Sequence, residues 1–499
     1  MSRAFTWCWV FLVMLPLVGC SAREQDQGSG DADTGQALEW IVETSSWDDQ
    51  EAVFQEEEGP YPATRTPFQP VVPTALVLPT LTPTPTLVPT PTPQPVDLAN
   101  PIPPAKSPGF PGPAPYLSAQ LGGQVINIML LGTDQRDKGA FRTDTLLIAS
   151  IRPQENSISI LSIPRDLYVY IPAKGMHKIN TAYLWGEVNR YPGRGPASLK
   201  DTILYNLGIS IDHYALVNFN GFRKAVDLLG GVDMPLSCPY TDWHVIDPRR
   251  SLELQSNWKL LTVGPGVVHM DGDLALWYAR SRLKSSDYDR GRRQQEVLRA
   301  IYSQAMRLNV LPRVPELYQQ FQENVTTDLE LEDLLALVPM ALNLGEADIR
   351  SYYITAGMVK PSTADGMYVQ YPKTERILEL VKRFLSAPGA EDAIRKAVQV
   401  EVCNLSGNPG WDALAAERLH YAGYETADCG LGAAEQQAVS FVQKLHPDVE
   451  ASVSAEVLAV LGLPLERLSE ALDAAAPAQY RLVVGRDYDP CFSPFKLTH

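Results

Sequence analysis

A proline- and threonine-rich run in the first quarter of the chain most restricts how this sequence can fold. It contains Pro79-Thr-Leu-Thr-Pro-Thr-Pro85 and Pro89-Thr-Pro-Thr-Pro93, and the 499 residues include 41 prolines. Proline has a fixed φ angle and no backbone N–H, so such a run favours extended polyproline II structure. At ~3.1 Å per residue, some fifty residues reach on the order of 150 Å. We interpret residues 61–120 as a semi-rigid stalk, which excludes a single globular unit.

The segment before the stalk is typical of an exported lipoprotein. Arg3 precedes a short apolar run, Trp7 to Val18, which matches a secretory signal and is too short for a comfortable membrane span. Leu17-Val-Gly-Cys20 resembles a bacterial lipobox, which predicts a signal peptide over residues 1–19 and lipidation of Cys20. The alternative is an uncleaved anchor. Both interpretations predict an extracytoplasmic, membrane-anchored protein of the cell envelope.

Charge is unevenly distributed along the chain. Residues 20–60 contain twelve Asp or Glu residues and a single Arg, without sustained hydrophobic periodicity, so we predict that this segment is disordered. The whole chain has a formal net charge of −16. Together with the export signal, this charge argues against nucleic acid as a partner, because a polyanion attracts basic proteins.

From Gln124 onward the hydrophobic pattern becomes that of alternating strands and helices. Strands are predicted over residues 125–131, 145–151, 157–163, 214–219 and 231–235, and helices over 198–207, 221–229, 271–279 and 289–308. This alternation indicates a layered α/β or α+β fold. We place this larger domain at residues 121–388.

A second, smaller pattern follows Pro388-Gly-Ala-Glu-Asp. It has predicted strands over residues 398–403, 424–428 and 481–484 and a helix over 411–422, which indicates a small C-terminal α/β domain at residues 397–490. The exported part also contains Cys238, Cys403, Cys429 and Cys491. Four cysteines allow three full pairings. Cys403 and Cys429 share one predicted domain and are the first pair to test, with buried free thiols as the alternative.

Polar and charged residues follow or precede the predicted strands of the larger domain. They are Asp134, Arg142, Asp144, Arg165, Asp166, Lys178, Asn180, Arg280, Arg282, Arg290, Arg293 and Gln294. Ligands of α/β proteins usually bind where strands end. Guanidinium groups match phosphate oxygens in bidentate geometry, and carboxylates recruit Mg²⁺, which also bridges phosphates. Phosphoryl transfer needs this combination.

Ordinary surface ion pairs, worth ~0–1 kcal/mol each, are the alternative explanation for any one of these residues. That explanation weakens for the set. Six arginines occur within twenty residues, with few acids to balance them: Arg280, Arg282, Arg290, Arg292, Arg293 and Arg299. In an acidic protein, such a cluster indicates a polyanionic ligand. On a helix, Arg290 and Gln294 share a face, and Arg293 can reach the same face or its flank.

Residues 125–310 resemble the LytR–CpsA–Psr (LCP) family of bacterial cell-envelope proteins. The resemblance rests on ordered motifs that include Asn127-Ile-Met-Leu-Leu-Gly-Thr-Asp134, Arg142-Thr-Asp-Thr145, Ser162-Ile-Pro-Arg-Asp166, Lys178-Ile-Asn-Thr-Ala-Tyr183, Tyr278-Ala-Arg-Ser-Arg282 and Asp289-Arg-Gly-Arg-Arg-Gln-Gln295. Residues 398–487 resemble the LytR-type C-terminal domain that often follows, through Val400-Glu-Val-Cys-Asn-Leu-Ser-Gly-Asn-Pro-Gly410. The resemblance implies an α-β-α layered catalytic domain with a central mixed sheet.

The resemblance also implies a phosphotransferase that moves a glycopolymer from a polyisoprenyl-pyrophosphate carrier to peptidoglycan, with an apolar tunnel for the lipid. Asp134 and Asp144 would hold Mg²⁺ or Mn²⁺. Arg142, Arg165, Arg280, Arg282 and Arg290 would hold the pyrophosphate, with Gln294 beside them, and Lys178, Asn180 and Arg293 are further candidates for this role. Either Asp144 or Asp166 could deprotonate the acceptor hydroxyl, so Asp144, Arg142, Arg165 and Asp166 form the predicted catalytic group.

Two departures from the family pattern leave questions open. A lipobox and a stalk stand where family members commonly have a transmembrane helix, which leaves open which membrane holds the anchor. The interval from Arg282 to Arg290 looks shorter than usual, so Arg290, Arg292 and Arg293 could exchange roles.

Two other functions use the same residues. One is a pyrophosphatase with water as acceptor, and the other is a non-enzymatic lipoprotein that binds envelope glycopolymer.

Overall fold

The structure, a computed structural model, describes residues 124–133, 143–247, 250–282, 287–322, 324–430, 436–473 and 475–492. The predicted signal peptide, acidic segment and stalk, with Cys20, lie outside the described residues, and so do Asp134 and Arg142. Among the helices of the described ranges, none combines the length and the apolar composition that crossing a membrane requires.

A six-stranded mixed sheet forms the centre of the larger domain. Its order is β11 (Val325–Thr327), β6 (His213–Asn218), β1 (Ile126–Thr133), β2 (Thr143–Arg152), β3 (Ser157–Ser162) and β12 (Ile349–Tyr353). Strand β1 runs parallel to β6 and antiparallel to β2, and β3 runs parallel to β12. Four of the predicted strands correspond to β1, β2, β3 and β6, and the fifth, predicted at 231–235, corresponds to β7 (Val232–Leu236), which pairs with β10 (Gly266–Met270) outside this sheet. The pattern gave no signal for the two edge strands, β11 and β12.

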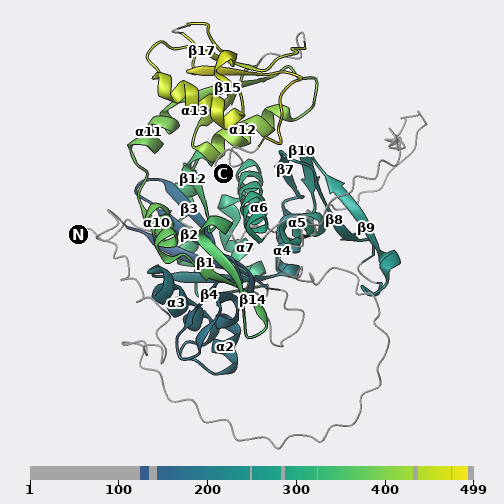
Figure 1. Ribbon diagram of the computed structural model, residues 1–499, viewed down its shortest axis with the longest axis vertical. Coiled ribbons are helices and arrows are strands. Elements are labelled where there is room, and N and C mark those ends of the chain that lie inside the picture. Colours follow the sequence, from purple (N-terminus) through teal and green to yellow (C-terminus); the bar gives the residue numbers. More distant parts are fainter. Residues whose placement is uncertain are drawn as a thin grey trace, which may run out of the picture.

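Both faces of the sheet are buried. Ile128 and Leu130 of β1 point into one hydrophobic cluster, and Met129 and Leu131 point into the other, because side chains alternate along a strand. Helices α4 (Phe219–Leu228), α5 (Gly272–Arg280) and α6 (Asp287–Arg307) cover the first face, and α3 (Arg194–Leu207) and α10 (Thr374–Leu385) cover the second (Figure 1). The predicted α-β-α layers with a central mixed sheet are therefore confirmed.

Smaller elements surround these layers, and most of them had no clear sequence signal. They are β4 (Tyr168–Ile171), β5 (Gly175–Lys178), α2 (Ala182–Val188), β7 (Val232–Leu236), β8 (Tyr240–Val245), β9 (Trp258–Val263), β10 (Gly266–Met270), α7 (Val314–Phe321), α8 (Leu331–Leu335), α9 (Val338–Ala341), β13 (Val359–Ala364) and β14 (Met367–Pro372). Strands β8 and β9 pair as an antiparallel hairpin beside α5 (Figure 1).

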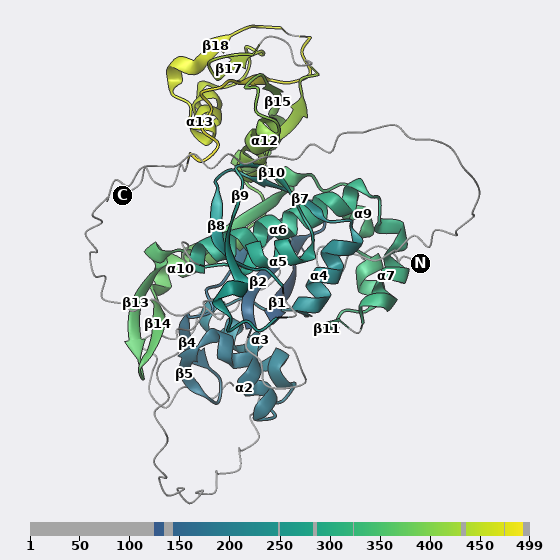
Figure 2. The same ribbon diagram turned by 90° about the vertical axis from the view of Figure 1, so that its right-hand side faces the viewer.

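The C-terminal part has its own sheet and its own core. The strand order is β16 (Glu425–Asp428), β15 (Gln399–Asn404), β19 (Tyr480–Val484), β17 (Phe441–Lys444) and β18 (Leu468–Glu470). Helices α11 (Ala390–Ala397), α12 (Trp411–Ala422) and α13 (Ala451–Leu461) accompany it, and a third hydrophobic cluster is confined to this part. The small C-terminal α/β domain is thus present, and α12 contacts β7 and β10 of the larger domain (Figure 2).

Covalent and ionic contacts join the two domains. Cys403 pairs with Cys429 inside the C-terminal domain, which is the pair that the sequence suggested testing first. Cys238 pairs with Cys491 across the domains. At the same interface His420 Nδ1 lies 2.7 Å from a carboxylate oxygen of Glu346. The remaining pairing, which the sequence left open, therefore links the end of the chain to the segment between β7 and β8.

Candidate active site

The topology of the sheet gathers the predicted residues at one edge. Asp144 lies at the start of β2, Arg165 follows β3, and Phe219 follows β6. The start of β2 pairs with the end of β1, and β6 runs parallel to β1, so these positions share the edge where β1 ends. The C-terminal end of α5 supplies Arg280, and the first turn of α6 supplies Arg290. Residues far apart in the sequence therefore meet in one place.

These residues line one small pocket, which we call the arginine pocket. Its lining consists of Asp144, Thr145, Arg165, Phe219, Arg280, Arg282, Arg290 and Gln294. Four guanidinium groups and one amide thus surround one carboxylate. This excess of positive charge at a partly enclosed site favours an anion with several oxygens, such as a phosphate or diphosphate.

An ionic chain fixes Arg165 in this pocket. Arg165 Nη1 donates to Asp144 Oδ1 at 2.7 Å, and both side chains are about one-fifth exposed. Behind them, the buried carboxylate of Asp166 lies 2.8 Å from Lys178 Nζ and 3.7 Å from Arg165 Nε. Asp166 is therefore compensated by two cations. It is not part of the pocket wall, and it positions Arg165.

Arg280 and Gln294 are held by neighbours in the same pocket. The Arg280 guanidinium lies 3.5 Å from the centre of the Phe219 ring, a cation–π contact that orients it. Gln294 Nε2 donates to Thr145 Oγ1 at 2.9 Å and to the carbonyl of Ala279 at 3.3 Å. Neither Phe219 nor Thr145 was predicted from the sequence as a site residue. Phe219 could have been recognised, because it is an aromatic residue at the end of a predicted strand, where the other site residues also lie.

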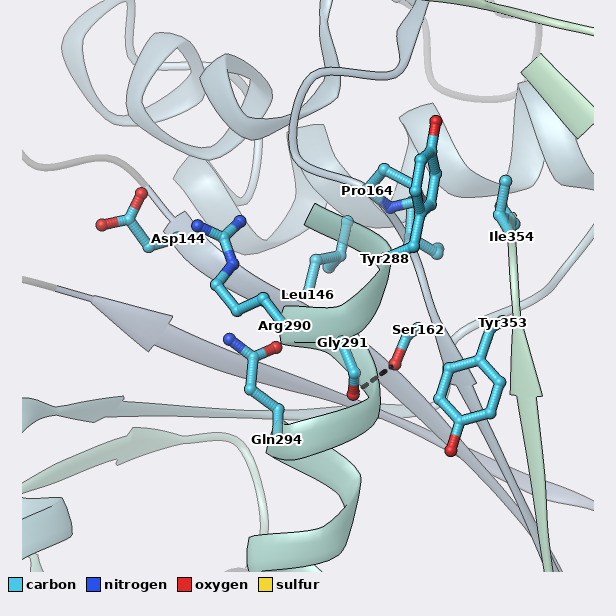
Figure 3. A pocket seen from close by; sticks show the side chains of 11 residues that line it. Asp144, Leu146, Ser162, Pro164, Tyr288, Arg290, Gly291, Gln294, Tyr353 and Ile354 are labelled. Atoms are coloured by element: carbon cyan, nitrogen blue, oxygen red, sulfur yellow. Dashed lines mark hydrogen bonds between the residues drawn. The ribbon is translucent and has the colours of Figure 1, made fainter. Parts of the chain in front are cut away.

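Helix α6 presents Arg290 and Gln294 on the side of Asp144, whereas Tyr353 and Ile354 lie on its other side (Figure 3). Gly291 permits this placement, because a Cβ atom there would lie only 3.1 Å from Cβ of Ser162. The helix N-terminus also adds partial positive charge near the pocket. The predicted pairing of Arg290 with Gln294 on one face matches this geometry.

Arg293, Lys178 and Asn180 do not line the arginine pocket, which corrects their predicted role in direct pyrophosphate binding. Arg293 is fully buried, and it donates to the carbonyls of Tyr278 and Ser281. Its side chain points into the core, so its guanidinium binds protein acceptors and not a ligand. Lys178 pairs with Asp166, and the buried Asn180 accepts from Thr143 Oγ1 through its backbone carbonyl.

Arg292 faces solvent on the same helix. Its side chain is 46% exposed, and its guanidinium pairs with Asp289 and Glu296. Desolvation lowers the pKa of the guanidinium, but the two carboxylates outweigh this effect and raise the pKa above its ordinary value. The three arginines of this motif therefore point in three directions. Arg290 faces the pocket, Arg292 the surface and Arg293 the core.

A second pocket of about 330 Å³, the side pocket, adjoins the first. It shares Asp144, Arg290 and Gln294 with the arginine pocket and is otherwise lined by Leu146, Ser162, Ile163, Pro164, Tyr288, Gly291, Tyr353 and Ile354 (Figure 3). Burial raises the pKa of Tyr353 to about 12, so its hydroxyl stays protonated at neutral pH. Asp144 lines both pockets.

An apolar cavity of about 830 Å³ opens beside the arginines. It lies between the sheet and helices α4, α5 and α6, and it shares Thr145, Phe219, Arg280 and Gln294 with the arginine pocket. The rest of its wall is almost entirely hydrophobic: Leu130, Leu131, Gly132, Leu147, Val217, Asn218, Phe222, Ala225, Leu276, Ala279, Val297, Leu298 and Ile301. The combined site suits an amphiphile with an anionic head and an apolar tail.

Comparison with known proteins gives a family match over the larger domain. A model of the LytR_cpsA_psr family matches residues 113–384, which is more than half of the chain. A protein of Oceanobacillus iheyensis named polyisoprenyl-teichoic acid–peptidoglycan teichoic acid transferase TagU is 33% identical over 220 residues, or 43% of this chain and 62% of that protein. A TagU of Halalkalibacterium halodurans is 33% identical over 217 residues, covering 42% and 64%.

The chain spans less than two thirds of the length of these relatives. Among solved structures, TagV of B. subtilis is 24% identical with a TM-score of 0.43, and the match covers 52% of this chain and 97% of that one.

Proposed function

Because the chain belongs to the LytR_cpsA_psr family, we propose that it is an extracytoplasmic phosphotransferase that attaches a glycopolymer from a polyisoprenyl-diphosphate carrier to peptidoglycan. One observation carries the proposal: a pocket with four guanidinium groups adjoins a hydrophobic cavity, with Arg280 in both walls. The diphosphate would lie among the arginines and the polyisoprenyl chain in the cavity.

The proposed step is a displacement at phosphorus. A hydroxyl of peptidoglycan attacks the phosphorus that carries the glycopolymer, a new P–O bond forms, and the bridging P–O bond of the diphosphate breaks. Polyisoprenyl phosphate leaves, and the hydroxyl proton passes to a carboxylate. Asp144 is our candidate for that carboxylate, because it lines both the arginine pocket and the side pocket, whereas Asp166 is buried behind Arg165. The arginines neutralise the phosphate oxygens while charge shifts to the leaving group.

The site also fits a divalent cation. Mg²⁺ is usually held by one or two carboxylates together with substrate phosphates. Asp144 offers one carboxylate beside the place we assign to the diphosphate, and Asp134, which lies outside the described residues, is the second candidate. Mg²⁺ or Mn²⁺ would supply further neutralisation of phosphate oxygens at this site.

We further propose that Cys20 carries a lipid anchor and that the stalk holds the catalytic domain away from the membrane. The supporting observations are the Leu17-Val-Gly-Cys20 motif and the proline-rich run. We assign the small C-terminal domain to the LytR-type domains on the motif that begins at Val400 and ends at Gly410.

The test is a reconstituted transfer reaction with the purified full chain, a polyisoprenyl-diphosphate-linked glycopolymer and peptidoglycan. We expect glycopolymer covalently attached to peptidoglycan and an equal amount of polyisoprenyl phosphate released. Release at the same rate without peptidoglycan would instead identify a pyrophosphatase. Retention of the donor without any release would identify a binding protein.

A further inference from the structure

A large cavity next to the arginine pocket has no part in the step described above. It encloses about 1990 Å³, open to solvent, between α5 and the β8–β9 hairpin, and we call it the hairpin cavity. It shares Phe219, Arg280 and Arg282 with the arginine pocket, so the two adjoin each other. Part of this volume is open solvent, and the cavity leaves room for a bulky polar group beside the arginines.

Helix α5 lines this cavity with a row of three different side chains. Asp273, Trp277 and Arg280 follow one another at intervals of four and three residues, which places them on one face of the helix, and all three line the cavity. Neighbours at this spacing are about 5–6 Å apart, close to the width of a sugar ring. The row thus begins at the arginine pocket and leads away from it.

Trp277 is held in a fixed orientation. Its Nε1 donates to the carbonyl of Trp243 at 2.8 Å, and its ring centre lies 5.8 Å from that of Tyr240 and 5.7 Å from that of His244, at interplanar angles of 62° and 69°. The residue is only partly buried, and it forms part of the cavity wall. A rigid, partly exposed indole offers the C–H groups of a pyranose ring a preformed aromatic surface.

Polar groups beyond Trp277 supply both donors and acceptors. Asp273 is 61% exposed and pairs with Arg223, and Asn220 lies in the same wall. This part of the cavity therefore contains an acid, a base and an amide, whereas the arginine pocket has four arginines to one carboxylate. Such a mixture suits the hydroxyl and amide groups of an uncharged sugar better than a second phosphate.

Each of the three spaces next to the arginine pocket suits a different part of the reaction. The apolar cavity suits the polyisoprenyl chain, and the side pocket, which Asp144 lines, is the space that the proposed function assigns to the incoming hydroxyl. The sugar that the diphosphate carries needs a third space. Given the proposed function, on which this inference rests, we infer that the hairpin cavity binds the sugar portion of the donor, with the first uncharged sugar on Trp277 and its polar substituents on Asp273 and Arg223.

Two probes test this site in the full chain: polyisoprenyl diphosphate, and the same lipid diphosphate with one N-acetylhexosamine attached. We expect wild type to bind the sugar-bearing probe about tenfold more tightly, as one or two net hydrogen bonds would give. Trp277→Leu and Asp273→Ala should abolish this difference and leave the affinity for the sugar-free probe unchanged. Trp277→Phe, which keeps an aromatic ring, should restore much of it.

Glu379→Ala on the far helix α10 is the matched control, because Glu379 is 65% exposed and lies outside the cavity wall. No sugar preference in wild type, or an unchanged preference in Asp273→Ala, would overturn the inference. Asp273 is exposed, so this variant still reads out if Trp277→Leu fails to fold. A wild type that prefers the sugar-bearing probe but transfers nothing to peptidoglycan would refute only the proposed function.

Discussion

Replacing the three arginines of the Asp289-Arg-Gly-Arg-Arg-Gln-Gln295 motif one at a time should give three different effects on transfer and on stability. Arg290 lines the arginine pocket, Arg292 pairs with carboxylates at the surface, and Arg293 is fully buried among carbonyl groups. We therefore expect Arg290→Ala to impair transfer, Arg293→Met to impair folding, and Arg292→Ala to change neither by much.

The size of each effect follows from the partner that is lost. Arg290→Ala removes a charge-assisted bond to phosphate worth about 1.5–3 kcal/mol, which lowers kcat/KM roughly 10- to 150-fold. Arg293→Met leaves two buried acceptors unpaired, the carbonyls of Tyr278 and Ser281, and each costs about 1–3 kcal/mol of unfolding free energy. In a domain of this size that is a loss on the order of 10 °C in Tm. Arg292→Ala loses an exposed ion pair worth about 0–1 kcal/mol.

Two measurements on each variant decide the matter: the rate of glycopolymer transfer and the Tm from thermal unfolding. Arg292→Ala is the matched control, since it removes the same charge from the same helix. If Arg292→Ala reduced transfer as strongly as Arg290→Ala, the assignment of these side chains to pocket and surface would be refuted. A Tm of Arg293→Met within 1–2 °C of wild type would refute the structural role of that buried guanidinium.

Three further predictions use other parts of the molecule. Arg165→Ala and Arg280→Ala should abolish transfer and leave the fold intact, with some loss of Tm only in Arg165→Ala, because the buried Asp166 then keeps only Lys178. Wild-type turnover in either variant would contradict its place in the site. Chelation should stop transfer by purified protein, and added Mg²⁺ or Mn²⁺ should restore it. Despite burial, which raises it, contact with His420 lowers the pKa of Glu346 from 4.5 to about 2. The resulting stability is complete above about pH 4.5 and is lost as the pH falls towards 2, so the Tm deficit of Glu346→Gln should shrink across that interval.

The layers of the larger domain were predictable because their signal is local. Strands such as β1 alternate between two buried faces, and Ile128 and Met129 sit in separate clusters. The edge strand β12 was missed, since it pairs with β3 from almost two hundred residues away and only the fold creates that pairing. Short edge strands carry too few residues for the alternation to stand out.

The candidate site was predictable as a set but not in every member. Helical spacing placed Arg290 and Gln294 on one face, and the structure brings both to the pocket. Helical spacing alone allowed Arg293 to reach that face or its flank. Its side chain instead points into the core, because the rings of Tyr240 and Tyr278 pack around the guanidinium there. The apolar cavity could not be read at all, because a residue that lines a cavity and one that fills a core look alike in sequence.

The bond between Cys238 and Cys491 makes a covalent ring of most of the folded chain, since the two cysteines are 253 positions apart. The connection between the domains, around Pro388 and the exposed Gly389, lies inside this ring. A protease that cut there once would open the ring without freeing either piece, and such a nicked molecule would migrate at full mass until a reductant was added. In an oxidising envelope, then, clipping at this connection would leave the C-terminal domain attached.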